Sequence, residues 1–387
     1  MVPEGWSRVP LEKIAEVRSG VAKGKKGLKN PVKIPYLRVA NVQDGRIDLT
    51  EVKTIEIEKD KLERYSLKFG DVLMNEGGDY DKLGRGDVWQ EQITPCLHQN
   101  HVFAVRPNPE AIDSFFLAAL AASNYGKTYF LRCAKRSTNL ASINSTQIKE
   151  FPVLVPPLPE QKKIAQILST WDKAITITEQ LLANSQQQKK ALMQQLLTGK
   201  KRLLDKNGVR FSGEWEAGYL SEIAKINKGK ALSSKDLKVG NYPVVAGGKA
   251  SPYNHSQFTH ENVITVSASG AYAGYVDYHP YKLWASDCSV VSNKNGFDIG
   301  FIYQLMKSLQ IKIYSLQSGG AQPHIYPKDL EVIRVPILEL KEQQKIASVL
   351  SVADQEIIAL KQRLDVLKQE KKALMQQLLT GKRRVWV

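Results

Sequence analysis

The chain has 387 residues, enough for two or three domains, and its 55 Lys and Arg against 39 Asp and Glu give a formal net charge of +16. An apolar fraction of 42% and a charged fraction of 24% are those of a folded globular protein and exclude a disordered one. No apolar run is long enough to cross a membrane, the first residues carry no signal-peptide core, and the three widely spaced cysteines do not suit a disulfide framework. We therefore expect a folded cytoplasmic protein.

The positive charge is concentrated in two parts of the chain. Residues 160–212 carry a net charge of +6 and residues 341–387 a net charge of +5, whereas the remaining segments carry +4 and +1. A basic surface favours a polyanionic partner, because each neutralised phosphate releases condensed counterions. A solvated lysine-rich surface would explain the charge equally well, so charge alone does not identify the partner.

Residues 1–157 are predicted to form a first mixed α/β domain. Runs rich in β-branched and aromatic residues at 34–39, 102–105 and 151–155 are typical of strands. Residues 112–122 favour a helix. The segments between are rich in Gly, Asn, Ser and Tyr, a composition suited to loops that present polar side chains.

Two basic clusters stand out in this domain. The first is interleaved with glycines and consists of Lys23, Lys25, Lys26, Lys29 and Lys33. Such a loop is suited to phosphates, which position a nucleic acid without specifying its sequence, although a solvated mobile loop is the alternative. The second cluster lies directly before Ser137, Thr138 and Asn139 and consists of Arg132, Lys135 and Arg136.

Residues 158–200 are predicted to form one long helix. Neither Gly nor Pro occurs from Glu160 to Thr198, and Gly199 is placed to end the helix. Apolar residues follow alternating steps of four and three, the pattern of a coiled-coil seam. The predicted packing residues are Ile164, Leu168, Trp171, Ile175, Leu182, Leu192 and Leu196. Such a helix is about 60 Å long, at roughly 1.5 Å per residue.

A linker at 201–213 is expected to lead into a second mixed α/β domain at 214–338. Strand-like runs occur at 262–266 and 332–335, and a helix is predicted at 299–308. The start of this segment repeats the start of the first domain at an offset of 209 residues. Trp6, Leu11, Ile14, Ala15 and Gly20 correspond to Trp215, Leu220, Ile223, Ala224 and Gly229. This weak repeat indicates that the two domains have similar structures.

Residues 339–382 are predicted to form a second long helix, followed by a basic tail at 383–387. Residues 371–382 repeat residues 189–200 without a change, and 24 of 41 positions are identical between 160–200 and 342–382. The packing residues of this copy are Ile346, Leu350, Ile357, Leu360, Leu364, Leu374 and Leu378. Two such helices in one chain can bury their apolar stripes against each other, which favours a pseudo-two-fold arrangement. Ordinary bundle helices, or a zipper between two copies of the chain, are the alternatives.

Motifs of enzymes that act on nucleic acids are not found. The Asn/Asp-Pro-Pro-aromatic tetrapeptide of adenine methyltransferases does not occur, and neither does a Walker A loop. Glu51 and Lys53, with Asp44 or Asp48, resemble a nuclease triad only loosely, at a spacing that is common by chance. We therefore predict a non-catalytic protein.

Candidate zinc ligands are equally poorly supported. Cys96, His98 and His101 lie close together in the sequence, with Cys133 farther on, but no Cys-x-x-Cys pair accompanies them. Polar packing or a DNA-facing histidine is the favoured interpretation, and no metal site is predicted.

Several short segments, taken in order, carry a family resemblance. In the first half these are Leu37–Val42, Gly70–Met74 and the helix entry Pro157–Gln161. In the second half they are Ser267–Gly270 with Ala273–Gly274, and Gly319–Pro323; the second helix entry departs from the pattern and reads Glu339–Gln343. Each segment is weak alone, but their order around a duplicated helix is specific. The chain resembles the specificity subunits of type I restriction-modification systems over nearly its whole length.

This resemblance implies an α+β fold in which two long antiparallel helices, paired as a coiled coil, separate two target-recognition domains. Each domain would recognise one half of a split site in double-stranded DNA. The resemblance also implies two methyltransferase subunits, which use S-adenosylmethionine, and nuclease-translocase subunits, which use ATP and Mg²⁺. No cofactor is then expected on this chain, and no membrane partner.

The resemblance turns polar residues of both domains into candidate DNA contacts. Asn and Gln can bond adenine, and Arg can bond guanine, through two hydrogen bonds each. The offset of 182 aligns 137–139 with 319–321, which brings Gln322 and His324 near the position of Asn139. The predicted contacts are Lys23, Lys25, Lys26, Lys29, Arg38, Asn41, Arg136, Ser137, Thr138, Asn139, Lys230, Ser269, Tyr272, Gln322 and His324. For Tyr272 and Tyr275, core packing is an equal alternative to stacking on a base.

Two other functions remain open at this point. One is an autonomous DNA-modifying enzyme with an unrecognised site, which activity of the isolated chain would reveal. The other is a coiled-coil adaptor that does not bind DNA, which sequence-selective binding by the partnered complex would exclude.

Overall fold

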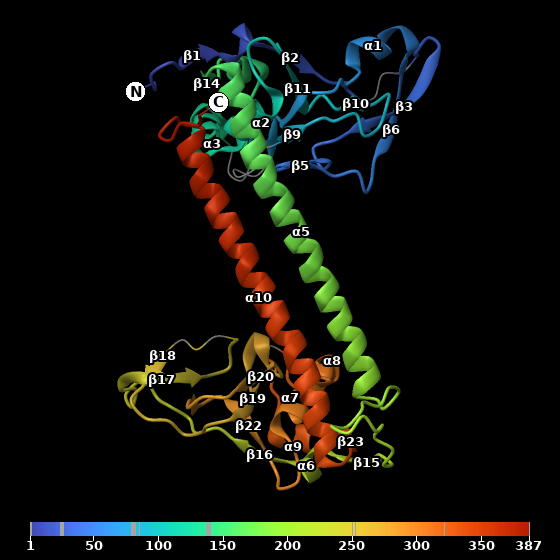
Figure 1. Ribbon diagram of the computed structural model, residues 1–387, viewed down its shortest axis with the longest axis vertical. Helices are drawn as coiled ribbons and strands as arrows, with labels where there is room; N and C mark the ends of the chain where they lie inside the picture. Colours follow the sequence, from blue (N-terminus) through green and yellow to red (C-terminus); the bar gives the residue numbers. More distant parts are fainter. Residues whose placement is uncertain are drawn as a thin grey trace. The chain divides into compact units, whose positions relative to one another are not determined.

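The computed structural model describes residues 2–23, 27–78, 83–84, 86–136, 141–249, 251, 253–320 and 322–386. The chain divides into two compact units: unit 1 contains residues 1–178 and 363–387, and unit 2 contains residues 179–362. Two helices, α5 (Leu158–Leu196) and α10 (Leu340–Leu378), each begin in one unit and end in the other (Figure 1). Among the described residues, no helix is both long enough and apolar enough to span a membrane.

Unit 1 combines short sheets with short helices and with one part of each long helix. Its strands are β1 (Ser7–Pro10), β2 (Ala15–Ser19), β3 (Pro31–Leu37), β4 (Val42–Gln43), β5 (Arg46–Ile47), β6 (Lys53–Glu58), β7 (Val72–Asn75), β8 (Gly77–Gly78), β9 (Gly86–Val88), β10 (Leu97–His98), β11 (Val102–Pro107), β12 (Lys135–Arg136), β13 (Ala141–Ser142) and β14 (Pro152–Val155). Its other elements are η1 (Leu11–Lys13), η2 (Lys59–Lys61), α1 (Leu62–Tyr65), α2 (Ser114–Ala122), α3 (Asn124–Cys133) and α4 (Ser145–Lys149).

Unit 2 repeats this plan, with fewer strands among the residues that the structure describes. They are β15 (Glu216–Tyr219), β16 (Ala224–Lys228), β17 (Val239–Val245), β18 (Tyr253–His255), β19 (Val263–Ser267), β20 (Val276–His279), β21 (Trp284–Ala285), β22 (Cys288–Asn293) and β23 (Arg334–Ile337). The helices are α6 (Leu220–Ile223), η4 (Gly270–Tyr272), α7 (Ile299–Ser308), α8 (Gln310–Ser315) and α9 (Pro327–Glu331).

The two units share one topology. The antiparallel order β2-β11-β7-β9 in unit 1 corresponds to β16-β22-β19-β20 in unit 2, and the pair β1-β14 corresponds to β15-β23. In each unit a further strand, β3 or β17, lies between one parallel and one antiparallel neighbour. The prediction of two like α/β domains is therefore confirmed, and the weak sequence echo between their starts marks a real structural repeat.

Equivalent helices of the two units begin in the same way. Asp113 caps α2 by accepting a hydrogen bond from the backbone N–H of Phe116, and Asp298 caps α7 by accepting one from Phe301. The N–H of each capping aspartate donates to a glutamine of a long helix, Gln161 for Asp113 and Gln343 for Asp298, at 2.8 and 2.9 Å. These glutamines lie 182 residues apart, so the repeated helix segment carries the contact that fixes each domain to it.

The long helices run antiparallel within each unit. In unit 1, Asp172 of α5 pairs with Lys371 of α10. In unit 2, Lys189 of α5 pairs with Asp354 of α10 at 2.5 Å, and Ser185 donates to Glu356 at 3.2 Å. The predicted packing residues are all at least partly buried, and several of them, such as Ile164 and Ile346, join the cores of the domains. Ile164, Leu168, Leu196, Ile346, Leu350, Ile357 and Leu378 are buried, and Trp171, Ile175, Leu182, Leu192, Leu360, Leu364 and Leu374 are half-buried.

Each helix pair is held together by an equivalent set of three residues, an arginine, a glutamate and a tryptophan, which we call a clamp. In unit 1, Arg384 forms a bidentate ion pair with Glu160, the N–O distances being 2.7 and 2.8 Å, and Trp6 donates its indole N–H to the same carboxylate at 3.2 Å. In unit 2, Arg202 forms the same bidentate pair with Glu342, and Trp215 donates to it at 3.0 Å. An arginine shortly after the end of one helix thus holds the carboxylate at the start of the other. Arg384, expected in a basic tail, is part of this clamp.

Candidate nucleic-acid interface

Unit 2 brings three of the predicted contact residues onto one small ladder. Ser269, which follows β19, forms a β-bridge with His324, and Ser318 forms another with His324. The N–H of Ser318 donates to the carbonyl of His324 at 2.9 Å and the reverse bond measures 2.8 Å. Gln322, in the turn between Ser318 and His324, is exposed. This ladder therefore presents polar side chains from segments that lie about fifty residues apart in sequence.

An aromatic and basic cluster adjoins the ladder. Tyr272 in η4 is 44% exposed, and the ammonium of Lys249 lies 5.0 Å from the centre of its ring. The same ammonium lies 5.4 Å from the ring of Tyr275, which Lys307 approaches to 5.0 Å. Burial raises the pKa of Tyr275, so its hydroxyl stays protonated near neutral pH. An exposed ring beside a lysine can stack on a base while the ammonium contacts a phosphate.

Sequence reasoning missed two members of this surface, Lys249 and Asp287. The hydroxyl of Ser269 donates to the carboxylate of Asp287, and both residues border Gly247. A carboxylate held in this way can accept a hydrogen bond from the exocyclic amine of cytosine. Lys249 follows a Gly-Gly pair in a loop, which is the signal that could have pointed to it; nothing in the sequence distinguishes Asp287.

Unit 1 has the counterpart of this ladder in the sheet β12-β13-β8. Gly77 pairs with Ser142 and Lys135 with the same serine, so Gly77 occupies the place that Ser269 takes in unit 2. Arg136 on β12 is exposed, and one of its guanidinium nitrogens donates to the carbonyl of Leu131 at 2.8 Å. The predicted contacts Ser137, Thr138 and Asn139 lie outside the described residues.

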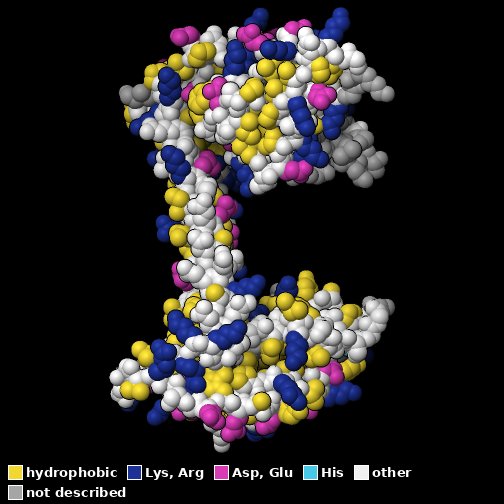
Figure 2. Space-filling model, turned by 90° about the vertical axis from the view of Figure 1, so that its right-hand side faces the viewer, with side chains coloured by type: hydrophobic (Ala, Val, Ile, Leu, Met, Phe, Trp, Pro, Cys, Tyr) yellow, Lys and Arg dark blue, Asp and Glu magenta, His cyan; other side chains and the backbone are white. Residues whose placement is uncertain are grey.

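Only three lysines of the first basic cluster, Lys23, Lys29 and Lys33, lie among the described residues. Lys23 is exposed, with its ammonium 6.0 Å from the ring of Tyr36, and Lys29 is exposed as well. Lys33 lines a cavity of about 540 Å³ between this loop and β6. Lys25 and Lys26 lie outside the described residues. Figure 2 shows that Lys and Arg side chains are spread over the displayed face of each unit rather than gathered in one region.

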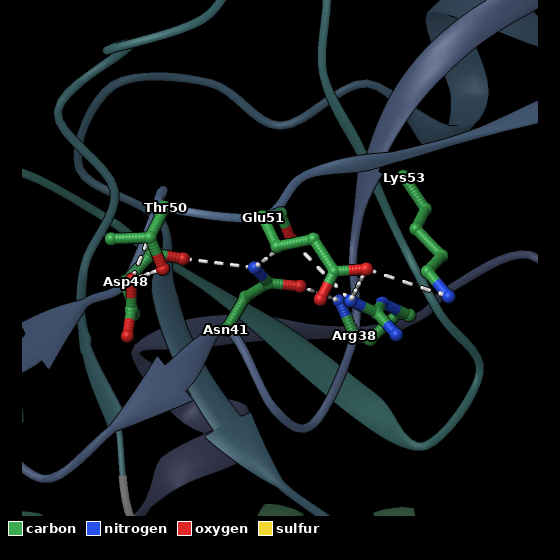
Figure 3. Close-up of polar contacts among 6 residues, drawn as sticks. All are labelled: Arg38, Asn41, Asp48, Thr50, Glu51 and Lys53. Atoms are coloured by element: carbon green, nitrogen blue, oxygen red, sulfur yellow. Dashed lines mark hydrogen bonds and ion pairs between the residues drawn. The ribbon is translucent and has the colours of Figure 1, made fainter.

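Asn41 acts differently from the prediction, because it braces a loop together with Arg38 (Figure 3). Asn41 is 3% exposed; its amide donates to the carbonyls of Asp48 and Glu51, and its oxygen accepts from the N–H of Arg38. All its hydrogen-bonding groups are thus used inside the protein. Arg38 lies beside Glu51, whose carboxylate also pairs with Lys53. The prediction that Asn41 contacts DNA is corrected on this ground: its burial keeps it from a base edge.

The same loop does not assemble a nuclease triad. The carboxylate of Asp48 accepts hydrogen bonds from the N–H and hydroxyl of Thr50, at 3.0 and 2.7 Å, while that of Glu51 faces Arg38 and Lys53. Within the described part of the chain, no three acidic, histidine or cysteine side chains converge as metal ligands. The carboxylates of Asp48 and Glu51 therefore stabilise the conformation of the loop.

The candidate zinc ligands are likewise engaged separately. Cys96 is buried and its thiol points at the carbonyl of Leu97. His98 donates from Nδ1 to the carbonyl of Val102 at 2.6 Å, and His101 pairs with Glu76. Each of these side chains thus has its own partner in the fold.

Lys230, another of the predicted contacts, lies beside Trp284 of β21. Its backbone carbonyl accepts the indole N–H of Trp284 at 2.8 Å, and its ammonium lies 5.3 Å from that ring. The residue is exposed beside β21, so it remains a candidate phosphate contact that the tryptophan positions.

Comparisons with known proteins agree with this architecture. The family described as type I restriction modification DNA specificity domain matches residues 3–184 and 212–369. The putative type I restriction enzyme MjaX specificity subunit of Methanocaldococcus jannaschii is 30% identical, with 99% of this chain and 95% of that protein covered. The type I restriction enzyme StySPI specificity subunit of Salmonella potsdam is 26% identical over 63% of this chain and 51% of its own length.

Solved structures show the same fold. A crystal structure of the type I restriction-modification S subunit from M. genitalium superposes with a TM-score of 0.67 at 17% identity, over 96% of each chain. A chain from a study of complex assembly and conformational transition of the type I restriction-modification system gives a TM-score of 0.58 at 17% identity, over 99% of this chain and 100% of that one. By the family match across most of its length and a relative similar throughout, this chain belongs to the type I restriction-modification specificity subunits.

Proposed function

We propose that each unit of this specificity subunit recognises one half of a bipartite DNA site through the ladder that both units share. The observation that carries this is the combination of one topology with different polar side chains, none of which is fully buried. Unit 1 presents Arg136 at its ladder, whereas unit 2 presents Ser269, Gln322 and His324. A constant frame with unlike polar residues is what two different half-sites require, because base edges are distinguished by their donors and acceptors.

The proposal assigns catalysis to partner subunits. Two methyltransferase subunits, which would bind S-adenosylmethionine, dock on the long helices, and nuclease-translocase subunits, which would bind ATP and Mg²⁺, complete the complex. Support comes from the solved relative, whose description concerns assembly of a type I restriction-modification complex. The repeated helix segments offer two equivalent surfaces in one chain, which fits two copies of one partner. Cytoplasmic localisation belongs to the same proposal.

Methylome sequencing of the host with and without this gene tests the proposal directly. We expect methylated adenines in one split sequence motif, present with the gene and lost without it. A motif that is continuous, or methylation that does not depend on the gene, would contradict bipartite recognition.

Purified proteins test the division of labour. The chain alone should show no methyl transfer, whereas the chain with its methyltransferase should bind the motif selectively, with affinity that falls as salt is raised. Turnover by the chain alone would point to an autonomous enzyme. A partnered complex without selective binding would point to an adaptor.

A further inference from the structure

Each unit has a pair of hydrogen-bonded polar side chains beside its ladder, and we call such a pair a dyad. In unit 1, Nδ1 of His101 pairs with the carboxylate of Glu76. In unit 2, the hydroxyl of Ser269 donates to the carboxylate of Asp287. His101 directly precedes β11 and Asp287 directly precedes β22, which are equivalent strands of the two four-stranded sheets.

Backbone hydrogen bonds show that the two dyads occupy equivalent places. The N–H of Glu76 donates to the carbonyl of His101 at 3.0 Å, and the N–H of Ala268 donates to the carbonyl of Asp287 at 3.2 Å. Each bond lies one residue beyond the paired strands, β7 with β11 in unit 1 and β19 with β22 in unit 2. His101 and Asp287 therefore correspond, and Ser269 is one residue beyond the counterpart of Glu76.

The same backbone also connects each dyad to its ladder. The N–H of Ile143, which follows β13, donates to the carbonyl of Glu76 at 2.7 Å. The N–H of Ile325, 182 residues later, donates to the carbonyl of Ala268 at 3.0 Å. The dyads thus lie on the surface that we propose for DNA recognition.

In each dyad one side chain is exposed and the other holds it. His101 and Asp287 are exposed, whereas Glu76 and Ser269 are half-buried. In unit 2 the residue nearby is Gly247, where a Cβ would lie 3.0 Å from the carboxylate of Asp287. A glycine at this position keeps that carboxylate uncovered. An exposed side chain that a second residue orients is suited to contact a ligand in a fixed geometry.

Both exposed side chains present a hydrogen-bond acceptor. An ionised carboxylate only accepts, so Nδ1 of His101 has to donate to Glu76, and Nε2 of the neutral ring is then an acceptor. The donors that bases present in the major groove are the exocyclic amines of cytosine and adenine. Adenine carries the acceptor N7 beside its amine, which repels a carboxylate, so Asp287 favours cytosine. Because a carboxylate is also repelled by phosphates, it contributes more to specificity than to affinity.

We propose that His101 in unit 1 and Asp287 in unit 2 each recognise the exocyclic amine of one base in their half-site, with Glu76 and Ser269 as positioning residues. This inference rests on the proposed function and deepens it. It gives each unit one specificity-determining contact at an equivalent place of the shared frame, made by a different side chain.

The test uses the full chain with its partner methyltransferase and methylome sequencing of the host. His101→Ala should make one position of one half-site degenerate, and Asp287→Asn should do the same to one position of the other half-site. The position that responds to Asp287→Asn should be a C·G pair in the wild-type motif. We expect discrimination between the preferred base and the next best to fall by about tenfold or more at that position alone.

Glu110→Ala and Asn295→Ala are the matched controls. Both residues are exposed and lie beyond the opposite ends of β11 and β22 from the dyads. These variants should leave the motif unchanged. Thermal unfolding of every variant checks that the fold is intact.

The positioning role of Glu76 has its own readout. Glu76→Ala should relax the same position as His101→Ala, and the double variant should be no more relaxed than either single variant. Glu76→Gln, whose amide oxygen can still accept from Nδ1, should restore discrimination. A merely structural role would lower stability and leave the motif as it is, which would overturn this assignment.

An unchanged motif with His101→Ala or with Asp287→Asn would overturn the inference for that unit and leave the proposed function standing. Where a variant abolishes methylation, its purified complex is titrated with DNA substituted at each position of the wild-type motif. An equal loss of discrimination at every position would also overturn the inference, whereas a loss at one position supports it. If the wild-type chain gives no split motif at all, the proposed function itself fails.

Discussion

At two equivalent positions of the domains, the close approach of another backbone segment requires a glycine. Gly20 and Gly229 correspond in the sequence echo between the two domains. A Cβ on Gly20 would lie 2.1 Å from the carbonyl oxygen of His98, and one on Gly229 would lie 2.4 Å from that of Ser286. Both glycines therefore allow an edge of the sheet to pass directly against another strand, which no other residue type permits.

We predict that Gly20→Ala lowers the free energy of unfolding by about 2 kcal/mol or more, because two backbone segments have to separate to admit a methyl group. Urea unfolding measures the effect. Gly213→Ala is the matched control, since a Cβ there meets nothing within 4 Å, and its stability should equal that of the wild type. Equal stability of both variants would contradict the close approach.

His98 gives the protein a specific dependence on pH. Burial lowers the pKa of His98 from 6.5 to about 4, so the ring is neutral in the fold but becomes protonated in the unfolded chain below pH 6.5. Stability is therefore full above pH 6.5 and is lost as the pH falls towards 4, by at most about 3 kcal/mol. We predict that His98→Gln, whose amide can still donate to Val102, flattens this part of the curve of unfolding free energy against pH. The wild type and variant should show the same slope if His98 does not titrate in this way.

At the level of the elements, the polar positions of the long helices determine how they pair. Lys189 and Lys371 interrupt the apolar seam, and each faces an aspartate of the other helix, Asp354 or Asp172. Charged groups at seam positions select one register and orientation over others, usually with little net gain in stability. The clamps formed by Glu160 and Glu342 add a second, stronger constraint, because these carboxylates are buried.

The clamp of unit 2 can be tested by Arg202→Ala. The carboxylate of Glu342 would stay buried with only the indole of Trp215 as a partner, so we expect a loss of about 2 to 4 kcal/mol in the unfolding free energy. Lys201→Ala, at the exposed neighbouring residue, should have no effect.

A double variant sharpens this test. Adding Glu342→Gln to Arg202→Ala removes the unpaired charge, so the double variant should be more stable than the sum of the single changes predicts. Additive losses would show that Arg202 acts through packing on Trp215 rather than through the ion pair.

For the molecule as a whole, the length of α5 and α10 is the quantity with the clearest functional consequence. Each helix has 39 residues and passes from one unit into the other. A change of one heptad keeps the seam in phase and alters the helix by about 10 Å, or roughly three base pairs of DNA.

We predict that removing residues 175–181 together with 362–368 shortens the unread spacer of the methylated site while both half-site sequences stay the same. Methylome sequencing with the shortened chain measures the motif. Changed half-site sequences with an unchanged spacer would contradict the role of the helices. Removing three residues from each helix instead should put the seam out of phase and abolish methylation.

The sequence by itself determined the repeat, the two long helices, the two like domains and the family resemblance. These follow from periodicity and from identity at a constant offset, which are properties of local sequence. The long helices at Leu158–Leu196 and Leu340–Leu378 lie where the sequence pattern predicted them, because the signals that begin, continue and end a helix act over a few residues.

Only the tertiary structure decided the role of individual polar side chains. Asn41 was predicted to contact a base, but it is buried and braces a loop. Arg384 was expected in a basic tail, but it forms an ion pair with Glu160. Lys249 and Asp287 were not foreseen as members of the surface in unit 2. In each case the deciding partner lies far away in the sequence, and burial, pairing and cavities depend on which distant segments the fold brings together.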